Sequence, residues 1–311
     1  MIIKSLETVF IMIIMIGVGW LMSYVGWLNT EGKRFIHKFI INISIPALTL
    51  TNFFQMFPKE MIGETIRFVF IGVLSMIVVF VLSEIVSKVI KLEKIKSGSF
   101  VSMSSVSNSL FFGMPIVLSL FGDISLPYIL FYYIANSFFF WGICAPRIMR
   151  DGNMKTVRIS DNIRKIFNAP FVALILSILL LSVDLKPPAL VLTVASYLGR
   201  PVTPLAAIFV GRIIYEIDFK KYKFEKSIFG VLFLRFIASP AVMFLMTRLF
   251  QLDKLSTQVM VIMAAMPAMV QTSLVSEMYG TDSKYVAFAI SLTTVMGLFF
   301  IPFYMFILNY L

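Results

Sequence analysis

Ten long apolar runs constrain the fold of this chain more than any other feature of its sequence. A helix needs about 20 mostly apolar residues to span the hydrocarbon of a membrane. Runs of roughly that length lie at 8–28, 35–56, 66–90, 99–121, 126–149, 166–183, 190–214, 227–250, 256–279 and 284–308. Only 14% of the residues are charged, too few for the surface of a water-soluble domain. Because the strands of membrane barrels are shorter and alternate in polarity, the runs predict an all-α polytopic membrane protein.

The basic residues are distributed unevenly between alternate loops. Of the 27 Lys and Arg residues, nineteen fall on one side and six on the other, with Arg200 and Arg235 inside apolar runs. Lys and Arg favour cytoplasmic loops. We therefore expect the loops at 88–98, 147–165 and 216–226 in the cytoplasm and both termini outside the cell (plasma or inner) membrane. The net charge of +11 then reflects topology and indicates no nucleic-acid partner.

The chain divides at its longest polar loop into two halves of five runs each. A constant offset of 158 residues relates Pro46 to Pro204 and Gly122 to Gly280. An odd number of spans per repeat inverts the second copy in the membrane, an arrangement typical of secondary transporters. The predicted parts are a first five-helix repeat, a cytoplasmic connecting loop and a second, inverted five-helix repeat, at 1–150, 151–165 and 166–311.

The fourth run contains residues that an uninterrupted membrane helix tolerates poorly. Its segment "SNSLFFGMPIVLSLFG" carries Asn108, Gly113 and Pro115. Proline lacks an N–H group and clashes with the preceding turn, so we expect this helix to break or kink near residues 111–115. The freed backbone groups find no partners in lipid, so the break must face protein or a water-filled cavity.

The ninth run repeats the theme in the second half of the chain. In "VIMAAMPAMVQTSLVSEMYG", Pro267 is followed by the polar residues Gln271, Thr272 and Ser273. We expect a second break near residues 266–270, close to the first break near mid-membrane. Two interrupted helices at corresponding positions in two repeats are a sequence indication of a transporter's substrate site.

Several motifs, in order along nearly the whole chain, resemble the auxin efflux carrier family, which includes plant PIN-FORMED carriers and bacterial organic-acid permeases. They are "IPALTLTNF" (45–53), "NSLFFGMP" (108–115), "NAPFVALILSILL" (168–180), "PLAAIFVG" (204–211), "RFIASPAVM" (235–243) and "AAMPAMVQTSLVSEMYGTD" (264–282). The resemblance implies ten helices in a 5+5 inverted repeat of the sodium–proton antiporter-like type, with broken helices 4 and 9 crossing. It also implies an organic anion as substrate and a homodimer.

The same resemblance implies where the substrate binds. Positions that match the family's polar contacts and helix breaks lie on the second, fourth, fifth and ninth helices. They are Thr49; Asn108, Gly113 and Pro115; Asn136 or Ser137; and Pro267 and Gln271.

Each candidate also has a structural interpretation. Asn, Ser and Thr often tie membrane helices together, at about 1 kcal/mol or less per contact, and the prolines can be simple kinks. Arg235 is a charge within a span, which is expensive in hydrocarbon. It can reach back to the interface, clamp backbone carbonyls, or set a positive potential for an anion.

The sequence lacks the features of several other functional classes. No span carries a central Asp–Asp or Asp–Lys pair, no Walker motif is present, and the single cysteine, Cys144, excludes an internal disulfide and a thiolate metal cluster. The sequence therefore predicts a secondary transporter with no cofactor, no metal and no enzymatic activity. We expect it to move a small organic anion, a carboxylate that is auxin-like or a dicarboxylate, across the lipid bilayer by alternating access. Potential-driven uniport is the first reading, and a Na⁺- or H⁺-coupled symporter or antiporter of the same fold is the alternative.

Overall fold

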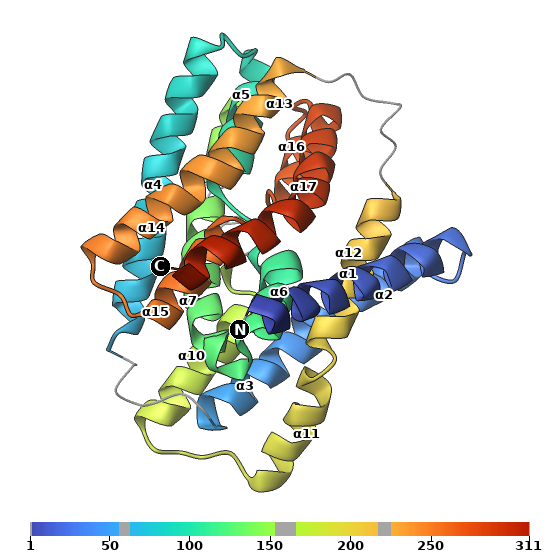
Figure 1. The fold of residues 1–311 in the computed structure, drawn as a ribbon, viewed down its shortest axis with the longest axis vertical. Coiled ribbons are helices and arrows are strands. Elements are labelled where there is room, and N and C mark those ends of the chain that lie inside the picture. Colours follow the sequence, from blue (N-terminus) through green and yellow to red (C-terminus); the bar gives the residue numbers. More distant parts are fainter. Residues whose placement is uncertain (1, 56–62, 153–165, 217–224, 311) are drawn as a thin grey trace. The chain divides into compact units, whose positions relative to one another are not determined.

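A computed structural model describes residues 2–55, 63–152, 166–216 and 225–310 (Figure 1). Within these ranges the regular structure is helical, and the β-type pairing is a single isolated bridge between Ser107 and Ala268. The chain separates into two compact units, each built from segments of both sequence halves. This division by contacts does not coincide with the two predicted repeats, and the 5+5 inverted repeat stays a prediction.

The first unit comprises residues 1–68, 110–131 and 167–216. It also contains the beginnings of α4 and α7, two helices that continue into the second unit. Its other helices are α1 (Ile2–Tyr24), α2 (Thr30–Phe39), η1 (Ile40–Ser44), α3 (Ile45–Gln55), most of η3 (Ser109–Gly113), α6 (Met114–Phe121), η4 (Asp123–Ser125), α10 (Ala169–Ser182), α11 (Ala189–Gly199) and α12 (Val202–Tyr215).

The second unit comprises residues 69–109, 132–166 and 217–311. Its helices are α4 (Thr65–Val89), α5 (Lys94–Ser105), α7 (Leu126–Phe139), η5 (Phe140–Cys144), α8 (Ala145–Asp151), α13 (Lys226–Phe233), η7 (Leu234–Ala238), α14 (Ser239–Leu249), α15 (Lys254–Ala264), α16 (Gln271–Met278) and α17 (Ser283–Tyr310).

Five helical stretches among the described residues are long and apolar enough to cross a membrane. They are Thr65–Val89, Asp123–Asp151, Ala189–Tyr215, Lys226–Leu249 and Ser283–Leu308. Shorter apolar helices cover Phe10–Tyr24, Ser109–Phe121, Ala169–Ser182 and Lys254–Ala264. The predicted all-helical, polytopic class agrees with this pattern. This pattern does not establish the predicted number of ten spans, because several of the predicted runs are divided between shorter helices.

Four helical stretches widen into a five-residue π-helical turn shortly before a proline. The turns η1, η3, η5 and η7 end two residues before Pro46, Pro115, Pro146 and Pro240. A proline cannot donate to the preceding turn and its ring crowds the carbonyl four residues back, which a wider turn relieves. The chain therefore stays helical across these prolines. Of the break or kink expected at 111–115, the break is wrong, since residues 109–121 form one helical stretch, and the kink stays a prediction.

In the first unit, α1 and α12 pack closely at two glycines. A Cβ atom added to Gly19 would lie 2.2 Å from the carbonyl oxygen of Ile208. One added to Gly211 would lie 2.1 Å from the carbonyl oxygen of Ile16. Real side chains cannot approach backbone this closely, so the absence of a side chain at both positions sets the distance between the two helices.

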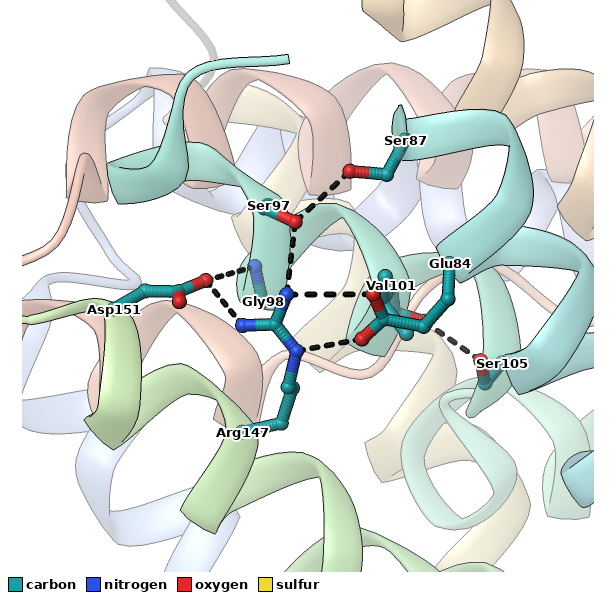
Figure 2. A network of polar contacts seen from close by, with 8 residues as sticks. All are labelled: Glu84, Ser87, Ser97, Gly98, Val101, Ser105, Arg147 and Asp151. Carbon is teal, nitrogen blue, oxygen red and sulfur yellow. Dashed lines mark hydrogen bonds and ion pairs between the residues drawn. The ribbon is translucent and has the colours of Figure 1, made fainter. Parts of the chain in front are cut away.

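In the second unit, an arginine joins three helices. Figure 2 shows Arg147 of α8 between Glu84 of α4 and Asp151 of its own helix. Its Nε lies 2.5 Å from Glu84 Oε1, and its Nη1 lies 2.5 Å from Asp151 Oδ2. The same Asp151 oxygen accepts the backbone N–H of Gly98 in α5 at 2.6 Å. Because a charged hydrogen bond is stronger than a neutral one, this network fixes the first turns of α5.

Candidate substrate site

Two helices of the second unit are interrupted in mid-course. The first, α5, ends at Ser105, and Val106 to Asn108 follow as non-helical chain. The second, α15, ends at Ala264, and α16 begins only at Gln271. The second interruption lies where the sequence predicts it. The first comes several residues before the predicted position.

The two interruptions meet. Ser107 and Ala268 form an antiparallel bridge, and the backbone N–H of Asn108 donates to the carbonyl oxygen of Pro267 at 2.8 Å. Both segments are buried, with Ser107 and Ala268 fully inaccessible to solvent. Each break therefore supplies part of the hydrogen bonding that the other has lost, as buried backbone groups require.

Asn136 of α7 supplies hydrogen bonds to the backbone of the first break. Its Oδ1 accepts the backbone N–H of Ser107 at 3.0 Å, and its Nδ2 donates to the carbonyl of the same residue at 2.9 Å. Nδ2 also lies 3.4 Å from Ser109 Oγ. The side-chain amide thus pairs with the extended backbone in the manner of a neighbouring strand. Asn136 lies at the predicted site, and both polar atoms of its side chain already have hydrogen-bond partners within the protein.

Thr293 of α17 performs a similar task at the second break. Its Oγ1 accepts the backbone N–H of Ala268 at 3.2 Å. Reasoning from single residues missed this contact, but the repeat offset contained a signal for it. Adding 158 to the position of Asn136 gives Thr294, the next residue along the chain.

Arg235 of η7 joins the ends of the two interrupted helices. Its Nη1 donates to the carbonyl of Ser104 at 3.2 Å, and its Nη2 donates to the carbonyl of Ala264. The hydroxyl of Ser239, 2.5 Å from Nη2, also donates to Ala264. The arginine is fully buried. The sequence left three interpretations of Arg235 open, and the structure shows the one in which it clamps backbone carbonyls.

Two side-chain amides beside the breaks remain available. Asn108 is 4% exposed, and within the described part of the chain its side chain has no hydrogen-bond partner. Gln271, the first residue of α16, has a buried Oε1 without a partner among the same residues. Buried polar atoms are nearly always paired in proteins, so the unpaired Oε1 of Gln271 indicates a ligand or an ordered water beside the breaks.

The other predicted residues lie in different surroundings. Ser137 is buried one position after Asn136 on α7. Thr49 of α3 belongs to the first unit, where its hydroxyl donates to the carbonyl of Ile45 at 2.8 Å. Gly113 and Pro115 also belong to the first unit, at the junction of η3 and α6. The structure brings Asn108, Asn136 and Pro267 together, and a role for any candidate in binding stays a prediction.

Apolar helices of spanning length, together with interrupted helices that meet through their backbones, define a multi-pass membrane protein of the transporter class. The family described as "membrane transport protein" matches residues 4–305, and the chain belongs to it. This is the auxin efflux carrier family that the sequence motifs resemble. A match over nearly the whole chain leaves the transporter class in no doubt.

Two archaeal relatives match over most of both chains. An uncharacterized transporter of Methanocaldococcus jannaschii is 25% identical over 299 residues, covering 94% of this chain and 95% of the relative. An uncharacterized transporter of Methanothermobacter thermautotrophicus is 22% identical over 303 residues, covering 96% of each. Similarity over whole chains indicates a shared architecture and leaves the substrate to be inferred from the site.

Proposed function

We propose that this protein carries a small organic anion, a carboxylate that is auxin-like or a dicarboxylate, across the cell membrane by alternating access. Membership of a transporter family supports transport itself. The chemistry at the two helix breaks supports an anion as the cargo. In this proposal the substrate carboxylate lies against the breaks of the second unit, and the protein works in a cell membrane with both termini outside, as a homodimer.

The single observation that carries the proposal is the unpaired amide of Asn108. Its backbone N–H donates to the carbonyl of Pro267. Its side-chain amide has no hydrogen-bond partner among the described residues. The neighbouring Asn136 has its amide occupied by Ser107. An amide N–H donates well to a carboxylate oxygen. A bound carboxylate would supply the missing acceptor.

The charge around the breaks also favours an anion. The segments 104–109 and 264–271 contain no acidic residue that would repel an anion, and the buried guanidinium of Arg235 satisfies the carbonyl ends of the two interrupted helices. The first turn of α16 adds the partial positive charge of a helix N-terminus. An anion can therefore bind here without a dedicated lysine, weakly enough to be released on the other side.

A thermal-shift screen of the purified protein against a panel of organic acids tests this proposal. A ligand that binds only the folded state raises its midpoint of unfolding. We expect the midpoint to rise with the cognate acid in the wild type and in Asn42→Ala, a control at an exposed asparagine. It should not rise in Asn108→Ala, nor in Asn108→Asp, which places a negative charge beside the anion. A full shift in Asn108→Ala would remove Asn108 from the site.

A further inference from the structure

Arg235 is an unusual residue because its charge is fully buried without a carboxylate partner. Its side chain is inaccessible to solvent, and none of the ion pairs formed by the described residues includes it. An isolated charge in a protein interior is very costly, so buried charges are normally paired or bound to opposite partial charges. The question is what balances this one.

The balance comes from the C-terminal ends of two helices. In a continuous helix the carbonyls of Ser104 and Ala264 would accept the N–H groups of residues 108 and 268. Here those N–H groups donate to Pro267 and Thr293 instead. The two vacated carbonyls accept the two Nη groups of Arg235.

The sizes of the charges agree with this arrangement. Each helix C-terminus carries roughly half a negative charge. The ends of α5 and α15 together therefore offer about one unit of negative charge, which matches the single positive charge of the guanidinium. Because arginine stays protonated in proteins, this balance does not depend on a proton from solution.

Half-helix C-termini and unwound carbonyls are the groups that hold Na⁺ or H⁺ in transporters with broken helices. We propose that the guanidinium of Arg235 occupies the place of such a coupling cation, so that the carrier binds its anion without a co-transported Na⁺ or H⁺. This inference rests on the proposed function. It explains how two helix breaks can face each other with their carbonyl ends stabilised while no acidic residue is present in either segment.

The shape of the side chain supports a fixed cation. A guanidinium presents its donors in a rigid fork, and here the two arms of the fork reach carbonyls on two different helices. The hydroxyl of Ser239, four residues on, donates to Ala264 and lies 2.5 Å from Nη2. A lysine would supply the charge without the fork.

The test uses the purified full-length protein and needs no knowledge of the substrate. The midpoint of thermal unfolding is measured in NaCl and in choline chloride of equal ionic strength, and then with millimolar guanidinium. We expect the wild type to be indifferent to these cations. Arg235→Ala opens the cation's place, so its midpoint should be lower and should rise by about 2 °C or more with Na⁺ or guanidinium. Arg200→Ala, which removes an exposed arginine, should show no cation response.

Uptake of the anion into liposomes provides a second test of the inference. In liposomes, uptake of the organic anion by the wild type should be the same with and without Na⁺, and uptake by Arg235→Ala should increase at least about tenfold when guanidinium or Na⁺ is added. If Arg235→Ala gives no folded protein, Arg235→Gln, which keeps hydrogen-bond donors without the charge, is measured in the same way.

Two results would overturn the inference. One is a wild type whose stability or uptake depends on Na⁺. The other is the lack of any cation response in both Arg235→Ala and Arg235→Gln, including failure of both to fold with guanidinium present. A wild type that transports no anion would overturn the proposed function instead, and the cation dependence of unfolding would still be measurable.

Discussion

The backbone N–H of Asn108 donates to the carbonyl oxygen of Pro267 at 2.8 Å, although 159 positions separate the two residues in the chain. This one bond joins two interrupted helices, and the Ser107–Ala268 bridge lies beside it. The helix breaks are therefore a single structural element in which each segment replaces hydrogen bonds that the other lost. Substitutions that remove hydrogen bonds within this element should lower the stability of the protein, whereas substitutions that remove contacts with the ligand should not.

Asn136→Ala should destabilise the protein because the amide pairs with both backbone groups of Ser107. Leaving two buried backbone groups unpaired is expected to cost about 2–4 kcal/mol. Thermal unfolding of the purified variant, compared with Asn108→Ala, measures the effect. We expect a clearly lowered midpoint for Asn136→Ala and a nearly unchanged one for Asn108→Ala; the reverse order would mean that the two roles have been exchanged.

Arg147→Ala should be strongly destabilising, because it leaves the partly buried Glu84 and the buried Asp151 without their countercharge. Breaking a buried ion network by removing one partner costs about 3–5 kcal/mol. Arg150, three residues on in the same helix, is exposed, so Arg150→Ala should change stability by no more than about 0.5 kcal/mol. Equal effects of the two variants on the unfolding midpoint would contradict the importance of the network.

Gly19→Ala should disturb the packing of α1 against α12, where the new methyl group would meet Ile208 at 2.2 Å. Overpacking of this kind costs about 1–3 kcal/mol. Gly17 lies on the same helix with open space around it, so Gly17→Ala should be neutral or stabilising by up to about 1 kcal/mol. The pair of unfolding midpoints checks the close approach, and a harmless Gly19→Ala would mean that these helices are further apart.

The orientation in the membrane can be tested with single cysteines, because the native Cys144 is fully buried. Lys94→Cys lies in a loop expected in the cytoplasm, and Lys186→Cys lies in one expected outside; both positions are exposed. A membrane-impermeant thiol reagent added to intact cells should label Lys186→Cys and leave Lys94→Cys unlabelled until the cells are opened. Labelling in the opposite pattern would invert the topology.

Much of this arrangement is visible in the sequence, and one part of it is not. Pro267 lies in a real break, because α15 ends at Ala264 and α16 begins only at Gln271. Pro115 suggested a break in the wrong place. A local rule identifies the missing N–H of a proline, but the π-helical turn η3 absorbs that defect, and the helix is continuous through Pro115.

The true first break follows Ser105, and its causes are distant in the sequence. Its backbone is held by Asn136 and Pro267, and no local pattern in residues 105–108 announces those partners. Arg235 shows the same limit. The sequence marks it as a charge within a span, but the choice between a surface-seeking and a clamping side chain depends on carbonyls 131 and 29 positions away.

The most direct test of the account is potential-driven uptake of the organic acid identified by thermal shift, in liposomes with no Na⁺ or pH gradient. A potential of 100 mV is worth about 2.3 kcal/mol per charge, or nearly fifty-fold in the concentration of a monovalent anion. We predict that wild-type protein moves the anion toward the positive side of a potassium diffusion potential and that Asn108→Ala does not. Transport that ignores the potential and follows a Na⁺ or proton gradient, or an Asn108→Ala variant as active as the wild type, would contradict the account.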